Sequence, residues 1–259
     1  MERAYANTPA GQIHYRAEGN GEPVLFLHKA SLSSDEFTEL MPLLSNKCRI
    51  IAVDVLGCGS SEQPSFTPKI EDYALNIIDF LDAIKVQKTS IVGSLFGASI
   101  AVEMAVKYPD RVNKLVLCDL LHVEPETLSR AANDFKDETV IFKEDGSHLV
   151  EVWKGRGAKP GVNLEMVQCA TVEYLKSGLG VRAGDSHRAK FAYNVEPKLT
   201  QIKCPVLLLY SQRSGLFRRL EATRKFLPDA QAQLIENTPA FPTWENPQAY
   251  AQSIADFLK

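Results

Sequence analysis

Short apolar runs alternate with helical patterns along most of the chain. The runs are continuous, and they cover residues 24–27, 50–53, 90–92, 115–117, 206–209 and 233–235. Continuous apolar runs are typical of strands that are covered on both faces, as in a parallel sheet. Between them, residues 70–84 carry apolar side chains at helical spacing, and residues 96–108 are apolar on most sides and end before Pro109. This order predicts an α/β fold with a mostly parallel central sheet flanked by helices.

One long segment interrupts the alternation. Residues 122–199 contain amphipathic helical pieces joined by glycine-containing turns, and no convincing buried strand. We therefore expect a core formed by residues 1–121 and 200–259, with a helical cap formed by residues 122–199. Ligands bind at the carboxyl ends of the strands in open α/β sheets, so a cap over that edge would enclose a pocket.

Composition narrows the class of protein. The chain has 259 residues, of which 45% are hydrophobic and 24% charged, close to the averages for globular domains. A disordered chain would be poorer in apolar residues, and a nucleic-acid binder usually carries a basic excess, whereas the net charge here is −3. No apolar run approaches the roughly 20 residues of a membrane helix. These features predict no nucleic-acid partner and no membrane partner, and they leave the oligomeric state open.

Cysteines and the N-terminus indicate the compartment. The five cysteines are odd in number, scattered and without C-x-x-C spacing, so neither a disulfide framework nor a zinc site is indicated. The polar N-terminus does not resemble a signal peptide. We expect a cytoplasmic protein that needs no metal and no other cofactor.

Several motifs, in a shared order, resemble those of the α/β-hydrolase family. Residues 25–28 look like the strand that leads into the oxyanion turn, and residues 54–61 match D-x-x-G-x-G-x-S. Residues 91–98 match the strand, turn and helix start of the nucleophile elbow. Further matches occur at residues 108–119, 202–210 and 241–247. The resemblance covers most of the chain and implies a hydrolase-like core with an inserted cap.

The same resemblance implies that the catalytic triad is substituted. The elbow holds its nucleophile midway between two small residues, here Gly93 and Gly97, and the residue at that place is Leu95. The family's acid would fall at Ser214 and its base at Ala240. None of the three can take its role, and losing even one triad member costs several orders of magnitude in rate. We therefore expect no serine-type hydrolysis and, without Asp at position 95, no dehalogenase-like covalent step.

Other parts of the implied pocket remain. Ser94 is next to the elbow centre, but it is not expected to be a nucleophile. If Ser94 stood at the centre of the motif, Phe96 would fall at a position where glycine is needed. The resemblance implies an oxyanion hole built from the backbone N–H groups of Phe96 and Ala30, which side-chain substitution leaves in place. Lys29 replaces a family glycine. It could pair with a carboxylate ligand or act as a base or an amine nucleophile, but we favour a lysine directed to solvent.

The histidines have no clear catalytic role. His28 matches a structural histidine of the family's oxyanion loop. His122 follows a core strand near the pocket entrance and could pair with Asp119 as a base, although a surface position or a cap contact is favoured. His148 and His187 are expected to be solvated residues of the cap.

Three hypotheses follow from this pattern. The first is a protein that binds a small apolar carbonyl- or carboxylate-bearing molecule in the pocket without serine-type hydrolysis. The second is a non-hydrolytic or rewired enzyme, such as a lyase, isomerase or cyclase, that uses the same pocket. The third is a scaffold or partner subunit. The predicted ligand contacts are Lys29, Ala30, Ser94, Leu95, Phe96, His122, Trp153, Ser214 and Ala240.

Overall fold

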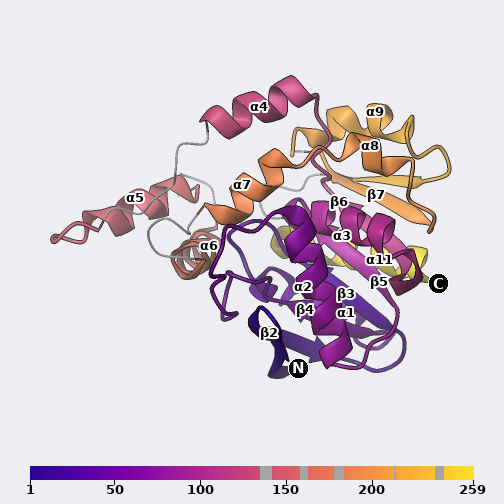
Figure 1. The fold of residues 1–259 in the computed structure, drawn as a ribbon, viewed down its shortest axis with the longest axis horizontal. Coiled ribbons are helices and arrows are strands. Elements are labelled where there is room, and N and C mark those ends of the chain that lie inside the picture. Colours follow the sequence, from indigo (N-terminus) through magenta and orange to yellow (C-terminus); the bar gives the residue numbers. More distant parts are fainter. Residues whose placement is uncertain (135–141, 158–162, 178–183, 213, 237–241) are drawn as a thin grey trace.

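A single eight-stranded sheet organises the structure, a computed structural model that describes residues 1–134, 142–157, 163–177, 184–212, 214–236 and 242–259 (Figure 1). The strand order is β1-β2-β4-β3-β5-β6-β7-β8. The strands are β1 (Glu2–Thr8), β2 (Gly11–Glu18), β3 (Pro23–Leu27), β4 (Arg49–Val53), β5 (Thr89–Ser94), β6 (Val112–Cys118), β7 (Val206–Ser211) and β8 (Gln231–Ile235). Strand β2 is antiparallel to both β1 and β4, and all other pairs are parallel. The predicted fold class is confirmed.

The two faces of the sheet bury separate hydrophobic cores. Helices α2 (Ile70–Ala83) and α3 (Phe96–Lys107) cover one face, and α1 (Met41–Leu44) and α11 (Pro247–Leu258) cover the other. Successive residues of β3 alternate between the two cores. Burial on both faces explains why the central strands are continuously apolar. Strand β8 differs because it is the edge of the sheet, and most of its side chains are exposed.

In the described residues between β6 and β7, where the cap was expected, the chain forms five helices. They are α4 (Pro125–Asp134), α5 (Ser147–Gly155), α6 (Leu164–Lys176), α7 (Asp185–Ala192) and α8 (Glu196–Leu199). No strand occurs in the described part of residues 122–199. Figure 1 shows α4, α5, α6 and α7 to one side of the sheet, with α5 farthest from it. The exact division of the chain into core and cap stays a prediction.

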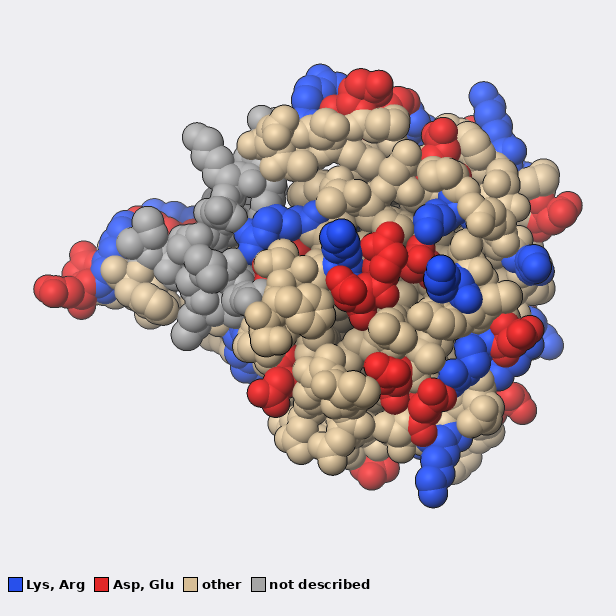
Figure 2. All heavy atoms as spheres, in the orientation of Figure 1, with Lys and Arg blue, Asp and Glu red and all other residues tan. Residues whose placement is uncertain are grey.

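Short elements complete the core. Where the structure describes the chain, the 3-10 helices include η1 (Ser34–Phe37), η2 (Pro109–Arg111) and η4 (Leu216–Arg219), and the short α-helices include α9 (Leu220–Arg224) and α10 (Pro242–Glu245). Positive and negative side chains are interspersed over the face seen in Figure 2. None of the helices in the described ranges has the length and apolar character needed to cross a bilayer.

Candidate functional site

A strained turn between β5 and α3 forms the centre of the candidate site. Leu95 occupies this turn with φ 49° and ψ −97°. A side-chain-bearing residue in such a sparsely populated conformation costs about 1–3 kcal/mol. The glycines on either side explain how the turn closes: a Cβ at Gly93 would lie 2.5 Å from the carbonyl oxygen of Gly97, and a Cβ at Gly97 would overlap the carbonyl oxygen of Leu27. This packing puts Leu95, and neither neighbour, at the apex.

The two neighbours of Leu95 are buried in the protein. Ser94 ends β5 and is buried. The ring of Phe96 packs into the core in an edge-to-face contact with Tyr73, with ring centroids 5.0 Å apart. The backbone N–H groups of Phe96 and Ala30 have no hydrogen-bond acceptor among the residues that the structure describes. They are therefore able to donate to a ligand oxygen.

A buried histidine holds the loop after β3. His28 Nε2 accepts a hydrogen bond from the N–H of Val55 at 3.0 Å, so Nδ1 carries the ring hydrogen and donates to the carbonyl oxygen of Lys29 at 2.6 Å. The ring is fully buried. These bonds fit the structural role expected for His28 and connect the loops after β3 and β4.

Asp54 anchors the same region from the loop after β4. Its carboxylate accepts hydrogen bonds from His14 Nδ1 and from the N–H groups of Ser34 and Ser60, each at 2.8 Å. Burial would raise the pKa of Asp54, but these hydrogen bonds outweigh it and hold the pKa well below its usual range. A Cβ at Gly59 would overlap this carboxylate, which explains the glycine in the D-x-x-G-x-G-x-S turn.

The side chain of Lys29 is mostly buried and lies beside a carboxylate of the protein itself. Its side chain is only 13% exposed, and its Nζ lies 3.8 Å from Oε1 of the buried Glu36. The other carboxylate oxygen of Glu36 accepts the backbone N–H of Lys29 at 2.7 Å. The expectation of a solvent-directed lysine is therefore wrong: Glu36 on η1 supplies an internal counter-charge that sequence spacing alone did not reveal.

A second buried carboxyl lies at the end of β6. Asp119 has φ 49°, and its Oδ1 accepts the N–H of Ser211 at 2.9 Å. Burial raises the pKa of Asp119, while the Ser211 N–H and the ammonium of Lys29 act in the opposite direction. Lys29, Glu36 and Asp119 thus form a buried group of one cation and two carboxyls, which we call the Lys29 cluster.

A cavity of about 250 Å³ opens above the elbow. Its lining residues come from both the core and the helices between β6 and β7: Lys29, Ala30, Leu32, Leu95, Gly155, Arg156, Ala170, His187 and Lys190. The cavity lies beyond the carboxyl ends of β3 and β5, where open α/β sheets bind ligands.

His187 is part of this cavity, so the expectation that it is solvated is wrong. The residue is half-buried, and its Nδ1 lies 3.3 Å from the hydroxyl of Ser31. Burial, followed by the charges of Lys190, Arg156 and Arg188, lowers the pKa of His187 to about 3. Its ring is therefore neutral near pH 7 and contributes a polar but uncharged wall.

The nine predicted contacts divide into three groups. Lys29, Ala30 and Leu95 line the cavity. Five others do not: Ser94, Phe96, His122, Trp153 and Ser214. Ala240 lies outside the described residues. Six lining residues were missed: Leu32, Gly155, Arg156, Ala170, His187 and Lys190. Leu32 lies in the loop after β3, and the other five lie between β6 and β7, where no local motif indicates which side of a cap helix faces the sheet.

His122 and Ser214 have structural roles instead. His122 is buried between the core and α8: its Nδ1 lies 2.9 Å from Thr223 Oγ1, and its Nε2 lies 3.1 Å from a carboxylate oxygen of Glu196. It thus joins α8 to α9, which is a cap contact, and the alternative expectation of a surface position is wrong. The hydroxyl of Ser214 donates to the carbonyl oxygen of Ser211 at 3.0 Å and closes the turn after β7.

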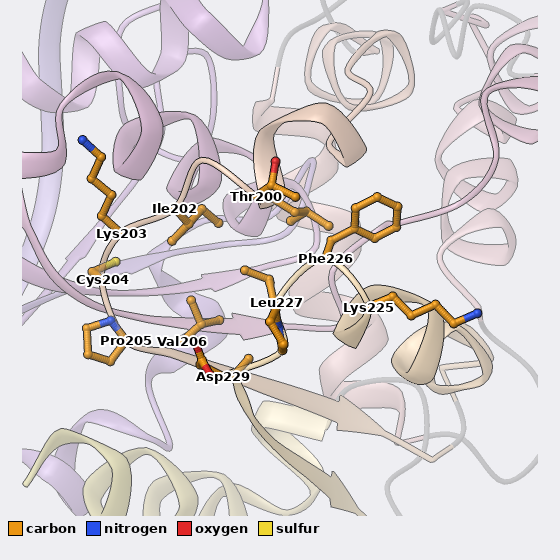
Figure 3. A pocket seen from close by; sticks show the side chains of 13 residues that line it. Thr200, Ile202, Lys203, Cys204, Pro205, Val206, Lys225, Phe226, Leu227 and Asp229 are labelled. Carbon is orange, nitrogen blue, oxygen red and sulfur yellow. The ribbon is translucent and has the colours of Figure 1, made fainter.

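A larger groove of about 700 Å³ lies elsewhere, before the start of β7 (Figure 3). Residues 202–206 and 225–230 line it, and most of its floor is apolar. In Figure 3, Lys203 and Lys225 extend away from its centre. The groove is at the amino end of β7, opposite to the edge where this fold class binds ligands. The smaller cavity at Leu95 is therefore the candidate site.

Comparisons with known proteins agree with this geometry. A family model described as alpha/beta hydrolase fold matches residues 22–247. The 2-(acetamidomethylene)succinate hydrolase of Mesorhizobium japonicum is 25% identical, over 95% of this chain and 91% of its own length. Haloalkane dehalogenase 2 of Mycobacterium bovis is 32% identical, but the match covers 51% of this chain and 46% of the dehalogenase.

Solved structures share the whole fold. A thermophilic esterase from Thermogutta terrifontis, solved with malate bound, has a TM-score of 0.78 at 21% identity and covers 100% of this chain and 98% of its own. The solved E-2-(acetamidomethylene)succinate hydrolase has a TM-score of 0.79 at 21% identity, with coverage of 99% and 98%. At these identities the likeness establishes the fold alone.

Proposed function

Because the chain belongs to the alpha/beta hydrolase fold family, we propose that it retains the family's pocket without the family's triad. In this proposal the protein binds a small carbonyl- or carboxylate-bearing molecule at the cavity above Leu95, without serine-type hydrolysis. The observation that carries the proposal is the apex of the elbow, where an aliphatic side chain holds the strained conformation between Gly93 and Gly97. Leucine has no atom that can attack a carbonyl.

The backbone around Leu95 supports binding. Ala30 lines the cavity, and its N–H group and that of Phe96, the residue after Leu95, are able to donate to a carbonyl or carboxylate oxygen. The amino end of the twelve-residue helix α3 adds a favourable partial charge for such an oxygen. Leu95, Leu32 and Ala170 supply apolar surface beside these donors. Apolar walls with a few convergent polar groups are typical of small-molecule sites.

The named relatives favour the same ligand chemistry. The 2-(acetamidomethylene)succinate hydrolase acts on a carboxylate, and the Thermogutta esterase was solved with malate. These relatives are hydrolases or esterases, so retained hydrolysis is the alternative that an experiment must exclude.

One observation favours a non-hydrolytic enzyme as the second candidate. The Lys29 cluster joins a cavity-lining ammonium to Asp119, whose raised pKa is a common property of acid–base groups. Such a cluster suits proton transfer to or from a bound carbonyl compound. Release of deuterium from an α-deuterated ligand in the presence of the protein, and its loss in Lys29→Met, distinguishes this candidate from simple binding.

Hydrolysis assays test the absence of the triad. We expect the wild-type protein to hydrolyse short-chain activated esters no faster than buffer, and Ser94→Ala to behave identically. The triple variant Leu95→Ser, Ser214→Asp, Ala240→His is expected to gain weak esterase activity, with Leu95→Ser alone as its control. Wild-type hydrolysis that Ser94→Ala abolishes would overturn the proposal.

Thermal shift assays test binding. A ligand at a hundredfold excess over its Kd stabilises the folded state by about 2.7 kcal/mol, which raises Tm by roughly 5–10 °C for a domain of this size. A panel of small oxo compounds and carboxylic acids is expected to contain such ligands. Leu95→Trp, which fills the cavity, is expected to abolish the shift, whereas Leu75→Trp on the exposed side of α2 retains it. If the ligand still raised the Tm of Leu95→Trp, the binding site would lie elsewhere in the protein.

A further inference from the structure

We infer that Glu103 is a positioning residue for the cavity: it fastens helix α7, and the cavity wall that α7 provides, to helix α3. Helix α3 starts at the elbow, and α7 carries His187 and Lys190, which line the cavity. The inference rests on the proposed function only in taking this cavity as the ligand site. It adds a residue that acts on the site through another helix.

Glu103 is an unusual residue for its place in the fold. Helix α3 is apolar along most of its length, and Glu103 is its one charged residue before Lys107. The side chain of Glu103 is only 4% exposed. A carboxylate is rarely buried to this degree unless it is paired, because burial removes its hydration. The partners of Glu103 therefore indicate what the buried charge does.

Two groups from the helical insertion pair with this carboxylate. The hydroxyl of Tyr193 donates to Glu103 Oε2 at 2.8 Å, and the Nζ of Lys198 lies 2.9 Å from the same oxygen. Burial, followed by the hydrogen bond to Glu103, raises the pKa of Tyr193, so the hydroxyl keeps its hydrogen and is the donor. Tyr193 follows directly after α7, and Lys198 is on α8. One carboxylate of the core thus holds the end of α7 and the next helix.

Tyr193 moves with α7 because it closes the last turn of that helix. Its backbone N–H donates to the carbonyl oxygen of Lys190 at 3.4 Å. Ala189 and the ring of Tyr193 are buried in the same hydrophobic core as α2 and α3. Helix α7 therefore cannot separate from α3 without breaking the hydrogen bond between Tyr193 and Glu103.

The other end of α7 contacts the loop after β3. Ser31 Oγ lies 3.3 Å from His187 Nδ1 and 3.5 Å from Ser186 Oγ. Ser31 follows Ala30 and has φ 57°, a conformation that persists only where the surroundings enforce it. Helix α7 thus touches the loop that carries the Ala30 N–H and is fastened to the helix that starts at Phe96. Its position therefore bears on both proposed N–H donors.

Amide hydrogen exchange of the whole protein tests the inference without a ligand. Tyr193→Phe removes one hydroxyl and no other atom. We expect it to speed the exchange of the α7 amides about tenfold or more, because a hydrogen bond to a charged group corresponds to at least that factor in an equilibrium. Local opening of α7 exposes these amides while the rest of the fold stays closed.

Two variants on the opposite face of the sheet are the controls. Tyr250→Phe makes the same chemical change at a buried tyrosine whose hydroxyl has no hydrogen bond within the described ranges. Ile254→Val removes a buried methyl group and weakens the fold in general. Both residues belong to α11, and both variants are expected to leave the exchange of α7 unchanged.

Glu103→Gln and Glu103→Ala separate the two partners of the carboxylate. Glutamine keeps a carbonyl oxygen that can accept from Tyr193, but it has no charge for Lys198. We expect the α7 amides to exchange faster in both variants, with a smaller increase in Glu103→Gln than in Glu103→Ala. Tyr193→Phe keeps the test decisive if Glu103→Ala does not fold.

Unchanged exchange of α7 in Tyr193→Phe would overturn the inference, because packing alone would then hold the helix. An equal increase in Ile254→Val would also overturn it, because a general loss of stability would then explain the effect. The ligand assays decide the proposed function separately. A protein that binds none of the ligand panel but shows the expected exchange would refute the proposed function alone, and one that binds ligands with unchanged α7 exchange would refute only this inference.

Discussion

Replacing Lys29 by methionine is expected to destabilise the protein by leaving the Glu36 carboxylate without its cation. Glu36 is buried, and the Lys29 Nζ lies 3.8 Å from it. Removing one partner of a buried ion pair costs roughly 3–5 kcal/mol. Glu36 keeps its hydrogen bond to the backbone N–H of residue 29 at 2.7 Å, and the Lys29 side chain is 13% exposed. We therefore expect a loss of about 2–3 kcal/mol, below that range.

Urea unfolding followed by circular dichroism measures this loss, with the slope of the transition checked for a change in two-state behaviour. In thermal unfolding the same loss lowers Tm by roughly 4–12 °C. Lys47→Met, which removes an exposed lysine, is the control and is expected to change the free energy of unfolding by less than about 0.5 kcal/mol.

A double-mutant cycle isolates the pair. Lys29→Met combined with Glu36→Gln is expected to be more stable than the sum of the single effects implies, with a coupling of about 1–2 kcal/mol. If Lys29→Met is no more harmful than the Lys47 control, Lys29 does not balance Glu36.

Three further predictions test the site. Gly97→Ala is expected to destabilise the protein by more than about 3 kcal/mol in urea unfolding, because its Cβ would overlap the carbonyl oxygen of Leu27; a smaller loss would contradict the tight elbow. Asp54→Asn is expected to cost about 1.5–3 kcal/mol near pH 7. The pKa of Asp54 is lowered in the folded state, so its stabilisation is present above the ordinary pKa and lost as the pH falls, and the difference between variant and wild type should vanish in acid. The pKa of His187, about 3, is also below its ordinary value, so the contribution of this neutral ring to folding stability is present above pH 6.5 and declines toward pH 5. His187→Gln is therefore expected to flatten the loss of stability that the wild type shows between pH 7 and 5. An unchanged slope of stability against pH would refute the burial of this ring.

Local patterns determined the fold and the position of the elbow. The six apolar runs all lie within strands β3 to β8, and both predicted helices coincide with α2 and α3 to within a residue at each end. Parallel strands covered on both faces must be continuously apolar, so this signal depends only on residues close in sequence. The centre of the elbow was equally local, because two glycines four residues apart leave one place for the apex.

Tertiary structure decided the chemistry around that apex. Lys29 and Glu36 are seven residues apart, but only the turn of the chain through η1 brings their side chains together. His187 and Lys190 reach the cavity from α7 and Arg156 from the residue that follows α5, and their polar sequences look solvated when read alone. The rotation of a helix about its own axis decides which of its side chains face the sheet. Packing against residues that are distant in sequence sets that rotation. The sequence therefore determined where a ligand would meet the sheet, and the packing of the helices above it determined which charges the ligand would meet.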